Sequence, residues 1–434
     1  MPPELIGIIG LAILLGLIFL GVPIGINLML VGFGGLWVLT SYKSSAIVLA
    51  ARPFIESSGF GFVALPLFIL MGEFALHGQI GEDAYNTAAK WLGKFPGGLA
   101  ISTTAGCALF GAMSGSSLAT NSLFSKIAFP EMIKRKYDVR LATGAIAASG
   151  TLAVLIPPSA LLIIYGILTD TSIGDILIAG YFPGFLSALI YMTMIVVRVK
   201  INPELAPVIP DVVSWKVKLN SIGKLWGILI VITIMLGGIF LGVFTPTEGA
   251  AFGALGTLLI ALLRRRLSIQ RITESLTETM RITAIVFPIL IGATVFTRFI
   301  ALSQITSRLG DLMSGMPANW VMIFFLIVFG IMGMFLDPIS MLSLGLPIFF
   351  PIVESLNISP VWFGILLVKS VELGGITPPL GINCYAVKAG VGDAVPLEDI
   401  FRGIIPFAIM DILTISIIFV FPSTATWLPN RIRG

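Results

Sequence analysis

Apolar stretches long enough to cross a bilayer follow one another along this chain. In the first half they lie near residues 4–22, 22–40, 54–77, 141–168 and 174–198, with a polar amphipathic stretch at 78–97. About 20 apolar residues span the hydrocarbon core as one helix. The pattern therefore predicts an all-α polytopic membrane protein that lies in a lipid bilayer.

Two shorter apolar pieces near 98–113 and 117–133 are separated by serine and glycine residues. Each is too short to cross the bilayer alone, so together they predict a re-entrant hairpin near 98–133. The next span, near 141–168, is broken at Pro157-Pro158. One half of the chain thus has about five crossings and one hairpin.

The same series returns 221 residues later, where segment 15–22 reappears as 236–243. Phe129-Pro130 recurs as Phe350-Pro351, and Pro157-Pro158 recurs as Pro378-Pro379. Separated matches at one offset indicate an internal duplication. We predict a first repeat at 1–198, a cytoplasmic linker at 199–224 and a second repeat at 225–434. The second hairpin is expected near 320–352 and the second broken span near 360–390.

Five crossings per repeat is an odd number, so the two repeats should be inverted relative to the bilayer. Charge supports this: residues 126–140 carry five Lys or Arg residues, whereas the equivalent 347–361 carry none. Basic residues collect on the cytoplasmic side of membrane proteins. The bias predicts a periplasmic N-terminus and a cytoplasmic linker. The net charge of +4 is explained by this topology and does not indicate a nucleic-acid partner.

Composition excludes several classes of function. Only 11% of residues are charged, against roughly 25% in soluble domains, so no soluble catalytic domain fits. Cys107, Cys384 and the single histidine, His77, offer no metal cluster, and no P-loop or nucleophile triad is present. We therefore expect no enzyme and no cofactor, and an ion gradient as the source of energy.

The first hairpin tip, residues 111–120, has four hydroxyl side chains and two glycines at membrane depth. Its counterpart at 332–340 contains Asp337, a rare acid within an apolar stretch. Tight turns expose carbonyl groups for a cation and N–H groups for an anion. The tips therefore predict a binding site, although small residues also serve close helix packing.

The broken spans, 149–159 and 372–383, combine glycine, hydroxyl groups and a double proline. Consecutive prolines remove backbone donors and free upstream carbonyls, and the following half-helix points its positive end at the break. Both breaks are candidate ion sites, with a simple proline kink as the alternative. Glu372, beside the second break, fits either an ion contact or a structural role.

These residues resemble the large membrane subunit of TRAP transporters, the tripartite ATP-independent periplasmic family. The motifs that carry the resemblance lie at 65–68, 111–120, 150–159, 245–248 and 377–381. Family members often have Gly where this chain has Ala153. The resemblance implies a Na⁺-coupled importer of a small organic acid, carboxylate or sulfonate, with elevator-type architecture in the bacterial inner membrane. A stand-alone Na⁺/carboxylate symporter of related architecture is the alternative.

The resemblance also implies two partners, a small four-helix membrane subunit and a periplasmic substrate-binding protein. Na⁺ is the only metal ion that the resemblance implies. By motif match, the expected sodium-binding residues are Ser114, Ser116, Ser117, Gly150, Ala153, Val154, Asp337, Ser340, Gly374, Gly375 and Thr377. The expected substrate-binding residues, between the two hairpin tips, are Ser116, Thr120, Pro157, Ser159, Pro378 and Asn383.

Overall fold

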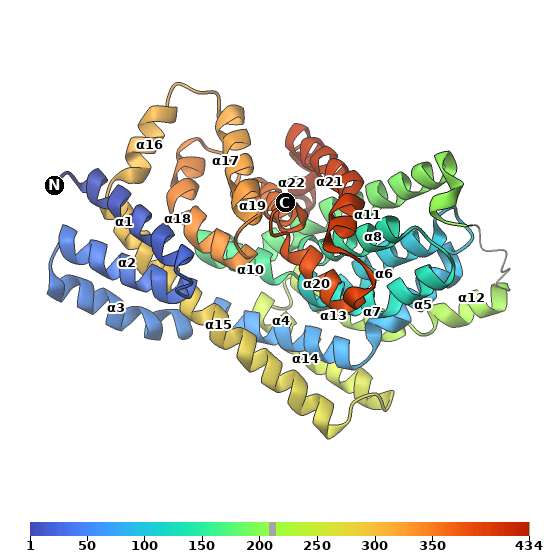
Figure 1. The fold of residues 1–434 in the computed structure, drawn as a ribbon. Coiled ribbons are helices and arrows are strands. Elements are labelled where there is room, and N and C mark those ends of the chain that lie inside the picture. Colours follow the sequence, from blue (N-terminus) through green and yellow to red (C-terminus); the bar gives the residue numbers. More distant parts are fainter. Residues whose placement is uncertain (208–213, 434) are drawn as a thin grey trace.

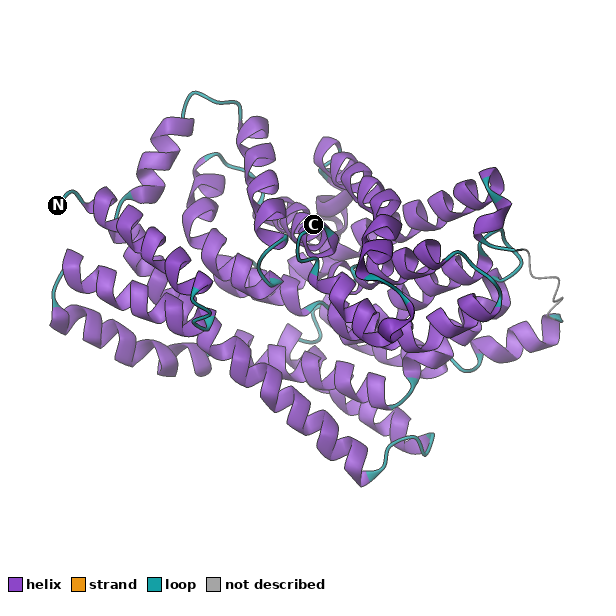
Figure 2. Ribbon diagram, viewed as in Figure 1, coloured by secondary structure: helices purple, strands orange, loops and turns teal. Residues whose placement is uncertain are grey.

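The computed structural model describes residues 1–207 and 214–433, and in this part of the chain every regular element is helical (Figure 2). Within these described residues, five helices are long and apolar enough to cross a membrane, and the number rises to eight if each bent pair counts as one span. Four shorter apolar helices accompany them. The prediction of an all-α, multi-pass membrane protein is confirmed.

The first half of the chain forms eleven helices (Figure 1). Their bounds are α1 Pro3–Phe19, α2 Ile24–Leu39, α3 Tyr42–Ser57, α4 Phe60–His77, α5 Ile80–Leu92, α6 Gly98–Ser114, α7 Ser117–Lys134, α8 Val139–Gly150, α9 Leu152–Leu155, α10 Ala160–Thr169 and α11 Ile173–Ile201.

The remainder of the described chain is similar in order. Its helices are η1 Pro203–Leu205, α12 Trp215–Ile222, α13 Trp226–Phe240, α14 Pro246–Leu263, α15 Ile269–Leu302, α16 Ile305–Met313, α17 Ala318–Gly333, α18 Pro338–Ser355, α19 Pro360–Ile376, α20 Ile382–Val391, η2 Gly392–Ala394, α21 Leu397–Val420 and α22 Ser423–Arg433.

Each half contains a helical hairpin followed by an interrupted helix. In the first half α6 and α7 meet at Gly115 and Ser116, and the α8–α9 segment bends by 43° relative to α10 across Pro157-Pro158. In the second half α17 and α18 form the hairpin, and α19 ends at Ile376 before the second double proline. The interruptions lie where proline removes the backbone donors that a continuous helix needs.

Three features lie outside the sequence-based expectations. Helix α3 was not predicted, because its residues are only partly apolar; it packs against α2 and the long helix α15. Helix α11 continues to Ile201, into the predicted linker 199–224, which also contains η1 and α12. Residues 208–213 of that linker, and Gly434 of the predicted second repeat, lie outside the described residues.

Besides the packing within each half, helices of the two halves pack against one another, and they do so reciprocally. Helix α2 packs on α15 while α14 packs on α4, and α8 packs on α21 while α11 packs on α19. Helix α7 contacts α20, and α10 contacts α18. In Figure 1, α1, α2 and α3 lie against α15 at one end of the molecule, while the hairpins and broken helices occupy the middle and the other end. The packing of the two halves against each other brings both hairpin tips to one central region.

Candidate substrate and ion site

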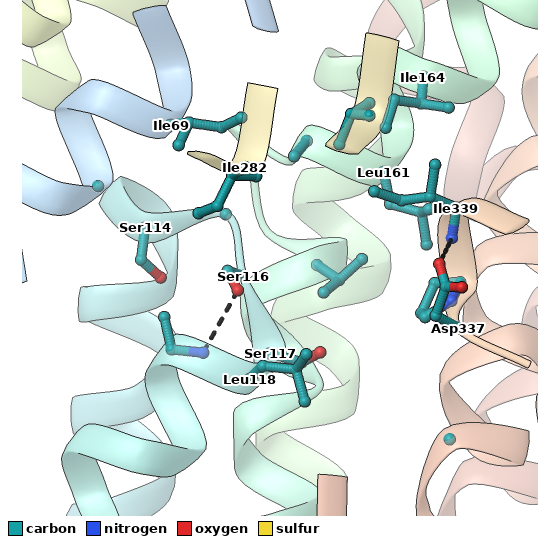
Figure 3. Close-up of a pocket in the computed structure, with 18 of the residues that line it drawn as sticks. Ile69, Ser114, Ser116, Ser117, Leu118, Leu161, Ile164, Ile282, Asp337 and Ile339 are labelled. Carbon is teal, nitrogen blue, oxygen red and sulfur yellow. Dashed lines mark hydrogen bonds between the residues drawn. The ribbon is translucent and has the colours of Figure 1, made fainter. Parts of the chain in front are cut away.

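A cavity of 510 Å³ lies where both hairpin tips meet helices α4 and α15 (Figure 3). Ser116 and Ser117 of the first tip lie on one side of it, and Asp337 of the second tip lies on the opposite side. Ile69 of α4 and Ile282 of α15 form part of the remaining wall. The size suits a small organic molecule, since ligand pockets measure about 300–1,000 Å³.

The first tip turns tightly and directs the start of α7 towards the cavity. Gly115 has φ +59°, and a Cβ there would come within 2.8 Å of the Pro158 carbonyl oxygen, so only glycine fits the turn. The Ser116 hydroxyl accepts a hydrogen bond from the Ala119 N–H at 3.3 Å and caps α7. The positive end of a helix therefore lies beside the cavity, where it favours a negatively charged group.

Asp337 caps the corresponding helix of the second tip. Its carboxylate accepts hydrogen bonds from the backbone N–H groups of Ile339 at 3.1 Å and Ser340 at 3.0 Å. The Ser340 hydroxyl donates to the same carboxylate. Asp337 is thus held in one orientation at the cavity wall, and a carboxylate oxygen has lone pairs left for a cation.

Close backbone packing joins each hairpin to its neighbouring broken helix. A Cβ on Gly111 would lie 2.5 Å from the Cα of Ala153, and a Cβ on Gly374 would lie 2.7 Å from the Cα of Gly333. Ala153 and Gly374 occupy equivalent places in the two halves, one repeat offset apart. At these positions the small residues serve packing, which was the alternative to a binding role.

The two halves also meet through a polar network at the cavity. Glu372 of α19 accepts hydrogen bonds from the Ser117 hydroxyl at 3.4 Å and from the Asn383 amide at 3.2 Å. Asn121 of α7 donates to the Asn383 Oδ1 at 3.0 Å. Sequence reasoning had left the role of Glu372 open and had not selected Asn121. The signal in the sequence that could have identified both residues is a polar side chain within an otherwise apolar helix.

Carboxylates dominate the charge of the cavity wall. Glu73, Glu278, Asp337 and Glu372 line it, and no Lys, Arg or His does so among the residues that the structure describes. Arg281 lies 3.6 Å from Glu278 but is not part of the wall. The described part of the wall therefore offers no cationic side chain to hold an anion.

The predicted site residues divide into two groups. Those on the cavity wall are Ser114, Ser116, Ser117, Val154, Asp337, Gly375 and Asn383. Those outside the cavity lining, in the adjoining turns and helices, are Thr120, Gly150, Ala153, Pro157, Ser159, Ser340, Gly374, Thr377 and Pro378. Several of the second group hold the turns in place: the Ser159 hydroxyl caps α10, and the Thr377 hydroxyl donates to the Leu373 carbonyl at 2.6 Å.

Comparison with known proteins gives the family. The chain is 33% identical over 401 residues to a C4-dicarboxylate TRAP transporter large permease protein of Pseudomonas aeruginosa, covering 92% of each chain. It is 32% identical to a sialic acid TRAP transporter large permease protein of Vibrio cholerae, covering 97% of each.

Among solved structures, the YdaH transporter of Alcanivorax borkumensis has a similar fold, with a TM-score of 0.60, 13% identity and coverage of 90% of each chain. A family model described as "Tripartite ATP-independent periplasmic transporter, DctM component" matches residues 11–424. The named relatives are transporter permeases and not enzymes. The chain therefore belongs to the TRAP transporter family and is its DctM component, the large permease subunit.

Proposed function

We propose that this permease imports a small organic acid, a carboxylate or sulfonate, together with Na⁺. The observation that carries the proposal is the cavity between the hairpin tips, whose described lining residues include four carboxylates and no cationic side chain. The named relatives from Pseudomonas aeruginosa and Vibrio cholerae are described as carriers of C4-dicarboxylates and sialic acid. A carboxylate substrate is in keeping with both descriptions.

The carboxylates make cations a requirement for binding an anion. Two like unit charges 4 Å apart repel by about 4 kcal/mol at an effective dielectric constant of 20. A substrate anion close to Asp337 or Glu372 needs bound cations to offset this repulsion. The family is ATP-independent, so an ion gradient is the available driving force.

The proposal includes two Na⁺ sites, which come from the match to the family motifs. One would use oxygen atoms of Ser114, Ser116 and Ser117 with backbone carbonyls of 150–154, and the other would use Asp337 and Ser340 with 374–377. Each set places a hairpin tip beside the interrupted helix of its own half. The substrate would lie between the tips, near Ser116 and Asn383, with its acidic group at the start of α7.

The reciprocal packing of the two halves supports inverted repeats and an elevator movement. In this proposal the hairpins and broken helices form the moving unit, and α1, α2, α13 and α14 with the long helices α4 and α15 form the scaffold. The cavity lies at the boundary between these two groups, since Ile69 and Ile282 belong to the scaffold side. The N-terminus would face the periplasm of the bacterial inner membrane.

The tripartite family description supports two partners, a small four-helix membrane subunit and a periplasmic substrate-binding protein. The test is reconstitution of the permease with both partners in liposomes, followed by uptake of candidate carboxylates and sulfonates with and without an inward Na⁺ gradient. We expect uptake only with Na⁺ and all three proteins. Uptake that is unchanged without Na⁺ contradicts the coupling, and full uptake by the permease alone favours the stand-alone symporter.

A further inference from the structure

The outer face of the α13–α14 pair carries an apolar groove of 270 Å³. This groove shares no lining residue with the cavity between the hairpin tips. Its walls include Trp226, Ile230, Ile234, Leu255, Leu259 and Leu263. Each of these side chains is at least 40% exposed. In a membrane protein such a surface meets either a lipid chain or a helix of a partner.

The floor of the groove is firmly built, because glycines let the two helices approach closely. A Cβ on Gly227 would lie 2.7 Å from Ile260, and a Cβ on Gly256 would lie 3.2 Å from Val231. Val231 and Ile260 are buried in the main hydrophobic core. The groove is therefore a fixed depression in the scaffold.

One end of the groove has the features of a membrane–water interface. Trp226 lies there at the start of α13, and the Arg264 guanidinium stacks over its ring at 5.4 Å from the centroid. Arg264 also donates to the Lys224 carbonyl oxygen at 2.5 Å. Tryptophan with a neighbouring cation is typical of the headgroup level, so an acyl chain in the groove would start at the correct depth.

The same end has an excess of positive charge. Arg264 and Arg266 share a single carboxylate, that of Asp83, each at 2.7 Å. Lys224 and Arg265 add two exposed cations beside them. Four cations and one paired carboxylate make this end attractive to an anion, whereas an apolar partner helix would gain nothing from it.

We propose that this groove binds a phospholipid with an anionic headgroup. One acyl chain lies along the groove, and the phosphate lies near Lys224 and Arg265. A cation close to a membrane surface contributes about 1 kcal/mol to attraction of anionic lipid, which corresponds to about fivefold in affinity. The two exposed cations together therefore give a preference of about 25-fold.

The test measures lipid binding to the purified complex of the permease and its small subunit. Delipidated complex is titrated with phosphatidylglycerol or phosphatidylethanolamine, and bound lipid is counted by native mass spectrometry. We expect tighter binding of phosphatidylglycerol, and a loss of about 25-fold in the Lys224→Gln/Arg265→Gln variant. The Leu259→Trp variant, which fills the groove, should lower binding of both lipids. Lys43→Gln, which removes an exposed cation on α3 away from the groove, is the control and should leave the binding of both lipids unchanged.

Three results would overturn the proposal. The first is equal binding of the two lipids by the unaltered complex. The second is an unchanged preference in the Lys224→Gln/Arg265→Gln variant. The third is a cross-link from Ile234→Cys to the small subunit at full yield, because a partner helix would then occupy the groove. None of these measurements depends on substrate or Na⁺, so they are independent of the proposed transport function.

Discussion

Asn121 donates a hydrogen bond to Asn383 at 3.0 Å, and this contact joins the first hairpin to the broken helix of the other half. Both side chains are buried, and Asn383 donates onward to Glu372 at 3.2 Å. Removing a partner in a buried pair leaves a polar atom unsatisfied. The pair is therefore a direct link between the halves at the cavity between the hairpin tips.

Replacing Asn121 by Ala should destabilise the permease by about 1–3 kcal/mol, since the Asn383 Oδ1 loses its donor. Asn383→Ala should cost a similar amount, and the double variant should cost less than the two together, with a coupling of about 1 kcal/mol. Thermal unfolding of the four proteins in detergent measures this cycle. Strictly additive losses would show that the two side chains do not interact.

Asp337→Asn should raise the Na⁺ concentration for half-maximal uptake by about tenfold, because it removes a charge from the proposed second Na⁺ site. Asn still caps a helix well, so stability should change little, whereas Asp337→Ala should also cost about 1 kcal/mol through loss of the cap. Uptake at graded Na⁺ separates the two effects. Asp311→Asn, an exposed acid on α16, is the control. An unchanged Na⁺ response in Asp337→Asn removes this residue from the site.

Gly374→Ala should damage both stability and transport. The added Cβ would lie 2.7 Å from the Cα of Gly333, so α17 and α19 must separate, at a cost of about 1–3 kcal/mol. Gly237→Ala is the matched control, since nothing lies within 4 Å of its Cβ position. Melting temperature and uptake should fall in the first variant alone. Equal behaviour of the two variants would show that the hairpin does not need this close contact.

Local composition was enough to predict the two hairpins, the two double-proline breaks and the position of Asp337 at a hairpin tip. Each stands out as an unusual residue or short run of residues in an apolar chain. The Asn121–Asn383 contact was not predictable, since 262 residues separate its members and only the packing of the halves unites them. Glu73 and Glu278 reach the cavity from α4 and α15, and neither was among the residues predicted to bind Na⁺ or substrate. Helix α3 was not predicted, because its sequence is partly polar and does not form a continuous apolar span.

The Lys369–Asp411 ion pair is fully buried, at 2.5 Å, between α19 and α21, and Tyr191 of α11 donates to the same carboxylate. Lys369→Met should destabilise the protein by about 3–5 kcal/mol, because Asp411 would be a buried charge without its partner. Adding Asp411→Leu should restore much of the loss, since an apolar pair leaves no charge to solvate. Thermal unfolding decides the matter: a double variant no more stable than Lys369→Met contradicts this account.

Neutralising Glu73 should strengthen substrate binding, whereas Asp337→Asn should weaken the response to Na⁺. Glu73 lines the cavity from α4 and is 9% exposed, and the His77 ring, which is charged only if protonated, lies 3.8 Å from its carboxylate. Charges about 8 Å apart at an effective dielectric constant near 40 repel by about 1 kcal/mol. Glu73→Gln should therefore lower the KM for a carboxylate substrate by about two- to fivefold.

The effect of Glu73→Gln should shrink in high salt, because salt ions that enter the cavity screen the repulsion between Glu73 and the substrate. Glu398→Gln, an exposed acid at the start of α21, serves as the control and should leave the KM unchanged. Initial rates of uptake across a range of substrate concentrations, at low and high ionic strength and constant Na⁺, measure both quantities. A raised KM in Glu73→Gln would mean that this carboxylate attracts the substrate, and the substrate would then carry a positive group.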